Sequence, residues 1–67
     1  MIICSINGDK RELSETCTVE CLLRDMDLLG RKLAVEKNGE IITKSRHAKE
    51  MIGNGDVVEI VTAVGGG

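Results

Sequence analysis

The sequence has 67 residues, of which 42% are hydrophobic and 30% charged, and its formal net charge is −2 at pH 7. A chain of this length builds one small domain with a single hydrophobic core, without room for a second domain or for an enclosed enzyme cavity of ordinary size. The chain contains no Phe, Tyr or Trp, and its basic and acidic residues are interspersed. We therefore expect no nucleic-acid binding, because aromatic stacking and a concentrated basic patch are both missing.

The three cysteines, Cys4, Cys17 and Cys21, occur without CxxC spacing. An odd number argues against a disulfide framework, and the spacing argues against a four-ligand zinc site. No stretch approaches the ~20 apolar residues that cross a bilayer, and no signal-peptide pattern opens the chain. We expect a soluble protein of the reducing cytoplasm, with no membrane contact and no metal site, unprocessed at its N-terminus apart from loss of Met1.

The first predicted element is a β-hairpin. Apolar residues alternate at Ile2, Cys4 and Ile6, and the Asn7-Gly8 pair that follows tolerates the positive φ angles of a tight turn. The return strand over residues 10–13 is short and polar, which suits the edge of a sheet.

A helix follows the hairpin. Thr18 is suited to cap its N-terminus by accepting a backbone N–H bond, and Glu20 lies in the positively polarised first turn. Gly30 is a suitable stop, which predicts about three turns of helix lying across a sheet. One face of this helix is apolar, because hydrophobic residues recur at helical spacing: Val19, Leu22, Leu23 and Met26.

The second half of the chain predicts three further strands. A strand over residues 33–37 and an extended segment over residues 40–42 flank an Asn-Gly turn, while residues 43–50 are polar and ambiguous. We expect Ile52 to be a buried anchor before a turn at 53–56, and residues Val57 to Val64 to form the longest strand. This order predicts an α+β fold of the ubiquitin-like β-grasp type, a mixed sheet packed on one main helix. Another α+β roll is the alternative.

The alternation of apolar residues in the last strand predicts a partner surface. Val58 and Ile60 share one face of this strand. If that face is core, Val61, Ala63 and Val64 leave an apolar patch beside the end of the chain that suits docking of a partner. The alternative is that both faces of the sheet are partly covered, since singly exposed apolar residues need no special cause.

The chain ends in Gly65, Gly66 and Gly67. Glycine has no Cβ and accepts almost any φ/ψ, so we expect a β-grasp domain over residues 1–64 and a flexible glycine tail over residues 65–67 that threads a narrow channel. Three extended residues reach about 10 Å, enough to present a carboxylate deep inside a partner. The other interpretation is a frayed terminus or a leftover linker.

The run from Asp56 to Val61 that leads into Val64-Gly65-Gly66-Gly67 resembles the C-terminus of the ThiS family, the sulfur carrier proteins of thiamine biosynthesis. Ile6-Asn7-Gly8 resembles the first hairpin of that family, and residues 35–38 with 40–42 resemble its central hairpin. Thr18-Val19 with Leu22-Leu23 resembles its helix start. The resemblance covers nearly the whole chain. The family commonly has aromatic residues near the position of His47 and shortly before the terminal glycines, where this chain has Thr62-Ala63, and these departures concern partner contacts.

The resemblance implies that a ThiF-like adenylating enzyme, using ATP and Mg, activates Gly67, and that a sulfur donor protein supplies the sulfur of a thiocarboxylate. A ThiG-like thiazole synthase would then receive that sulfur, with Gly65 and Gly66 threading the tail into each active site. The chain itself would bind no cofactor and contribute no catalytic residue, and we find no phosphate loop, HExxH motif or Ser/His/Asp set in the sequence. Alternatives are a molybdopterin-synthase-type sulfur carrier and a ubiquitin-like protein modifier or docking module.

Cysteine and histidine provide the other candidate sites. Cys21 falls almost opposite the apolar stripe of the helix and Cys17 precedes it by one turn, so we expect both thiols to be exposed. A helix N-terminus lowers thiol pKa, so Cys17 is either a reactive thiol that accepts persulfide sulfur or an incidental surface cysteine. Cys4 is expected to fill the core. His47 is expected to be solvated or to contact a partner, because a lone histidine lacks the companions of a metal site.

Overall fold

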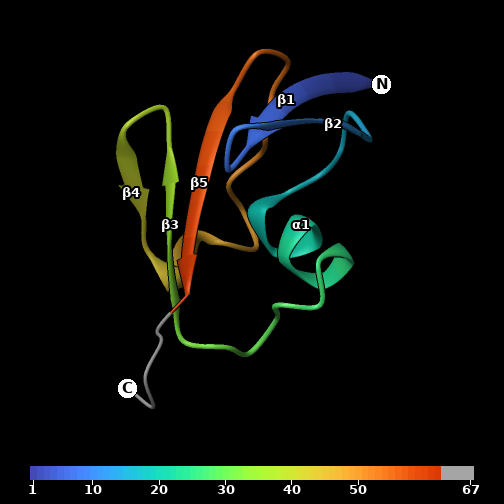
Figure 1. The fold of residues 1–67 in the computed structure, drawn as a ribbon. Helices are drawn as coiled ribbons and strands as arrows, with labels where there is room; N and C mark the ends of the chain where they lie inside the picture. The colour runs from blue at the N-terminus through green and yellow to red at the C-terminus, as the bar shows by residue number, and fades with distance from the viewer. Residues whose placement is uncertain (63–67) are drawn as a thin grey trace.

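The computed structural model describes residues 1–62 (Figure 1). Its elements are the strands β1 (Ile2–Ile6), β2 (Asp9–Leu13), β3 (Leu33–Lys37), β4 (Glu40–Ile42) and β5 (Val57–Thr62), the helix α1 (Val19–Asp25) and a 3₁₀ helix, η1 (Lys44–Arg46). The predicted last strand therefore begins where expected. Its residues Ala63 and Val64, like the glycines at 65–67, lie outside the described residues.

The strands form one five-stranded sheet in the order β2-β1-β5-β3-β4. β1 and β5 run parallel, whereas the other neighbouring strands run antiparallel. The final strand thus occupies the centre of the sheet, and α1 lies across one of its faces (Figure 1). This is the mixed sheet on one main helix that the sequence predicts, with β2 at an edge as expected.

Two Asn-Gly turns hold β5 in place. Asn7 and Asn38 have φ angles of 51° and 53°, and each is followed by a glycine that also has a positive φ, the conformation of tight hairpin turns. The side-chain oxygen of Asn7 accepts a hydrogen bond from the backbone N of Ile60 at 2.7 Å. That of Asn38 accepts one from the backbone N of Val57 at 2.9 Å. The same residues that turn the hairpins therefore also fix the central strand from both sides.

The helix begins as predicted and ends early. Thr18 Oγ1 accepts a hydrogen bond from the backbone N of Cys21 at 3.1 Å. The prediction of a third helical turn is wrong, because Asp27 takes a φ of 60° and the helix ends before Gly30. The backbone N of Leu28 donates to Leu23 O at 2.8 Å and that of Asp27 to Arg24 O at 3.0 Å, the bond pattern of a Schellman cap.

The core lies between α1 and the sheet. Alternate residues of β1 and β5 are buried, and the predicted anchor Ile52 is 2% exposed. Cys4 fills the core as predicted. The fully buried side chains come from the helix, three strands and the loop before β5: Leu22, Ile42, Ile52, Val19, Val35 and Val58.

Candidate functional site around the end of strand β5

β5 presents one buried and one open face. Val58 and Ile60 are 0% and 7% exposed, whereas Val57 and Val61 are 47% and 63% exposed. The alternation predicted for this strand is confirmed, and the face of the sheet away from α1 is open to solvent. Of the predicted partner surface, Val61 is therefore accessible, whereas Ala63 and Val64 lie outside the described residues.

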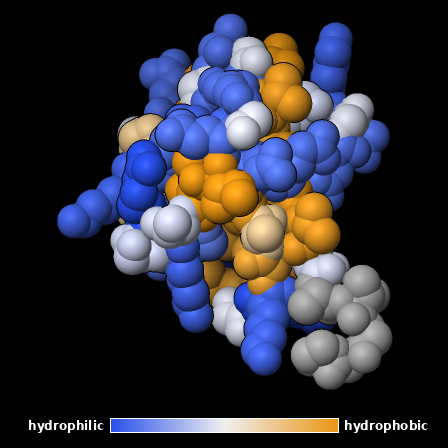
Figure 2. All heavy atoms as spheres, turned by 90° about the vertical axis from the view of Figure 1, so that its left-hand side faces the viewer, coloured by the Kyte–Doolittle hydropathy of each residue, from blue (hydrophilic) through white to orange (hydrophobic). Residues whose placement is uncertain are grey.

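A shallow groove lies where β5 ends and β3 begins. Thr62 pairs with Leu33 and Val61 with Ala34 across the two strands. Together with Lys32, these residues line the groove. Figure 2 shows apolar atoms gathered in the middle of this face with hydrophilic side chains around them. The groove reaches the last described residue, so an apolar surface adjoins the position from which the chain continues to its terminal glycines.

Cys17 is not the exposed thiol that the sequence predicts. It is 2% exposed, because the chain before α1 pairs with a distant loop: Ile52 N donates to Cys17 O at 3.0 Å. Burial raises the pKa of the Cys17 thiol to about 11, and a hydrogen bond with the Cys21 thiol adds to this effect. Burial also raises the pKa of Cys4. The position before the helix therefore does not activate Cys17.

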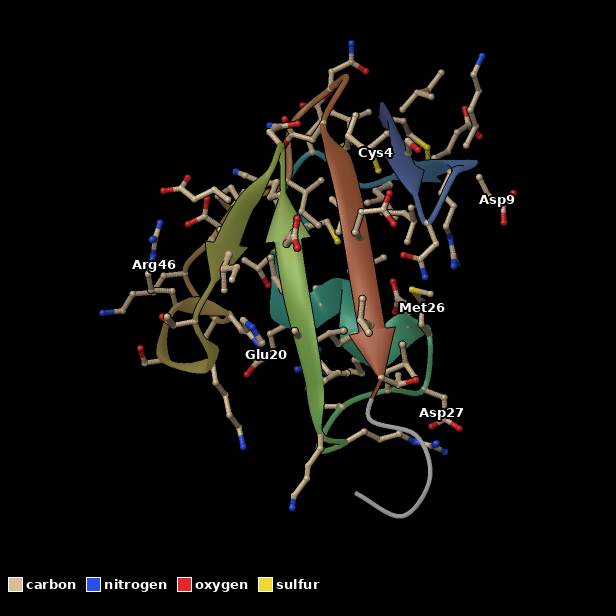
Figure 3. All side chains as sticks on the ribbon, turned by 60° about the vertical axis from the view of Figure 1, so that its left-hand side comes forward. Cys4, Asp9, Glu20, Met26, Asp27 and Arg46 are labelled. Atoms are coloured by element: carbon tan, nitrogen blue, oxygen red, sulfur yellow. The ribbon has the colours of Figure 1, made fainter. Side chains whose placement is uncertain are left out.

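Cys21 is half-buried against the core, so its expected exposure is only partly correct. All three cysteines are free thiols. Figure 3 shows Cys4 close to the β1–β2 end of the sheet, distant from the end of β5. Cys4 and Cys17 are thus buried, Cys21 is half-buried, and none of the three lines the groove.

His47 is half-buried and takes part in the hydrogen bonds of the fold, so it is only partly solvated, and the alternative of a partner contact stays a prediction. Its Nε2 lies 3.0 Å from the carbonyl oxygen of Ile42, and its own carbonyl accepts a hydrogen bond from Glu20 N at 2.9 Å. Figure 3 shows Glu20 on α1 facing the segment that follows η1, whereas Arg46 extends outward. Within residues 1–62, no group of three His, Cys, Asp or Glu side chains is arranged to hold a metal ion.

An ion-pair network beneath β3 was not predicted from the sequence. Lys37 Nζ lies 2.8 Å from Glu50 Oε2 and 3.8 Å from Asp56 Oδ2, and donates to the Met51 carbonyl at 3.0 Å. The sequence contains a signal for this network. Lys37 lies two residues after the buried Val35 on β3 and so faces the same side of the sheet, where a lysine needs charged or polar partners. The network ties the loop before β5 to the sheet.

This network shifts two carboxyl pKa values. The hydrogen bond from Lys37 lowers the pKa of Glu50. Burial alone would raise the pKa of Asp56, but hydrogen bonds from Asn38 and from the backbone N of Gly53, together with the charge of Lys37, lower it below its ordinary value. Both groups are thus charged at neutral pH and contribute to the anchoring of β5.

The described part of the chain contains no helix long and apolar enough to cross a membrane.

Comparisons with known proteins give a consistent result. The ThiS family model matches residues 4–67. The sulfur carrier protein ThiS of Bacillus subtilis is 40% identical over 63 residues, which cover 92% of this chain and 96% of that protein. A thiazole synthase of Paramagnetospirillum magneticum is 47% identical over 62 residues, which cover 92% of this chain but only 19% of the synthase.

The crystal structure of the thiamine biosynthesis protein ThiS from Geobacter metallireducens has a TM-score of 0.83 to this chain at 26% identity and covers 98% of this chain and 100% of that one. This similarity confirms the predicted ubiquitin-like β-grasp fold. The chain therefore belongs to the ThiS family, the sulfur carrier proteins of thiamine biosynthesis.

Proposed function

We propose that this protein carries sulfur as a thiocarboxylate on Gly67 and delivers it for synthesis of the thiamine thiazole. The observation that carries this proposal is that the match to the ThiS family continues to residue 67 and so includes the terminal glycines. The central position of β5 supports it further, because the strand that leads toward the tail is paired on both sides and so gives the tail a fixed base. Gly65 and Gly66 would form the flexible arm.

The chemistry requires an activating partner. A C-terminal carboxylate has a pKa near ~3.5 and is anionic at neutral pH, which makes it a poor acyl electrophile. A ThiF-like enzyme with ATP and Mg would form the acyl adenylate of Gly67 and release pyrophosphate. Sulfide would displace AMP directly. A persulfide on a donor protein would instead give an acyl disulfide, from which a thiol reductant releases the thiocarboxylate. The chain would act as a carrier and not as an enzyme.

Two kinds of partner would use the groove at the end of β5. The adenylating enzyme would load the tail, and a ThiG-like thiazole synthase would accept the sulfur. Support for the second comes from the thiazole synthase that contains a region 47% identical to this chain. Val61 would contact these partners, and so would Ala63 and Val64. We also place the protein in the cytoplasm, where its three free thiols suit a reducing environment.

Intact-mass measurement tests the proposal. The protein is incubated with ATP, Mg, a ThiF-like enzyme and a persulfide donor, and we expect the mass increase of an oxygen-to-sulfur exchange at the C-terminus. Deletion of Gly67 should abolish the exchange while the circular-dichroism melting curve stays that of the full chain. Failure of the full chain to form any adenylate or thiocarboxylate with cognate enzymes would refute the carrier role. Isopeptide conjugates to lysine would indicate a protein modifier instead.

A further inference from the structure

Two carboxylates face each other in the middle of the open sheet face. Glu36 on β3 and Glu59 on β5 are directly paired across the strands. Along the same two strands, the next pair on this face is Ala34 with Val61, and on its other side Glu36 pairs with Ile41, which is 63% exposed. The acidic pair therefore has apolar neighbours on two sides, Ala34 and Val61 along the strands and Ile41 across from Glu36.

This pairing is unfavourable in the free protein. Side chains directly opposite in an antiparallel pair have Cβ atoms about 4.5–5.5 Å apart, and like charges there destabilise the sheet. Among residues 1–62, none of the ion pairs involves either glutamate. Lys37, although next to Glu36 in sequence, points to the opposite face and binds Glu50. The fold thus places two negative charges side by side without compensating them internally.

We propose that Glu36 and Glu59 together receive one arginine or lysine side chain of thiazole synthase when that enzyme docks on the open face of the sheet. This inference rests on the proposed function and adds the chemistry of the partner surface: an apolar patch with a cation at its centre. An arginine suits the site, because its planar guanidinium can donate to two carboxylates at once. The surrounding Val61, Ala34 and Ile41 would exclude water from the contact and so strengthen it.

The register of the sheet also places the acidic pair next to the groove at the end of β5. The acidic pair lies two residues before the groove at the end of β5, since Glu59 precedes Val61 by two positions on the same face. A partner that holds the acidic pair therefore also covers the groove. Such a partner would lie beside Thr62, the residue from which the chain continues to Gly67.

The test compares binding of glutamine variants to thiazole synthase. Glu36→Gln and Glu59→Gln each remove one charge, and Glu12→Gln removes the same charge from β2, at the edge of the sheet, where Glu12 pairs with Ile3. Calorimetric titration with the unloaded carrier needs no sulfur transfer, so its outcome is independent of whether Gly67 is thiocarboxylated. We expect each of the first two variants to bind about tenfold or more weakly, and Glu12→Gln less than about twofold more weakly.

Thermal melting separates this role from a structural one. Because the like-charge pair destabilises the free sheet, Glu36→Gln and Glu59→Gln should melt at or above the wild-type temperature while they bind more weakly. Equal affinities of all three variants would overturn the proposal, as would weaker binding accompanied by a lower melting temperature. If the affinity loss occurs with the adenylating enzyme and not with thiazole synthase, the identity of the partner is wrong.

Discussion

Alkylation of Cys17 by iodoacetamide measures how far burial protects this thiol. The nucleophile is the thiolate, and the pKa of Cys17 rises from its ordinary value of 9.0 to about 11. At pH 8 the thiolate fraction is then about one in a thousand, compared with about one in ten for an ordinary cysteine. Alkylation should therefore be about a hundredfold slower than for an exposed cysteine. The 2% exposure of Cys17 hinders the reagent further.

Peptide mapping by mass spectrometry gives the rate for each cysteine in one sample. Cys21 is the internal control, because it is half-buried and lies on the same stretch of chain. In concentrated urea the protection should disappear and the two cysteines should react at similar rates. If Cys17 reacts in the folded protein as fast as it does in urea, the thiol is accessible and the reasoning from burial is wrong.

Three further predictions concern stability. Leu22→Ala removes a fully buried side chain, so the free energy of unfolding in urea titrations should fall by about 2–5 kcal/mol, and a loss below about 1 kcal/mol would place Leu22 outside the core. Thr18→Ala removes the helix cap and should cost about 1 kcal/mol, whereas Thr18→Asp, which can still cap, should restore most of it. The folded-state pKa values of Glu50 and Asp56 are lowered from 4.5 and 3.8, so their stabilisation is complete above these values and is lost as the pH falls through the folded-state pKa values. Lys37→Met should make this acid-induced loss of stability shallower in urea titrations at pH 7 and pH 3.5, and an unchanged pH dependence would contradict the network.

Local signals predicted most of the fold. The Asn-Gly pairs, the capping residue Thr18 and the two-residue alternation of β1 and β5 each act through neighbours in sequence, and each is found where expected. The end of α1 was missed because Asp27 takes a positive φ, for which aspartate gives a much weaker signal than the glycine three residues later. The helix stop was thus placed at the stronger signal.

Features set by contacts between distant residues were not predictable in the same way. Cys17 is buried by pairing with the loop at Ile52, which a helical wheel does not represent. The alternation of β5 predicted that Val61 faces away from the core. Which strand lies beside β5 depends on the order of the strands in the sheet, which local patterns do not determine. The groove and the Glu36–Glu59 pair both depend on β3 lying next to β5.

The protected thiols lead to a final prediction about sulfur loading. If Cys17 and Cys21 were intermediates that hold persulfide sulfur, replacing both with alanine would prevent formation of the thiocarboxylate. Because Cys17 is buried with a raised pKa and neither cysteine lines the groove at the end of β5, we expect the double variant to be loaded at Gly67 to the wild-type extent, measured by intact mass. The variant should be less stable, so loading is compared at a temperature where its circular-dichroism signal is fully native. Loss of loading under that condition would assign the cysteines a role in sulfur transfer and would contradict the view that all of the chemistry takes place at the C-terminal carboxylate.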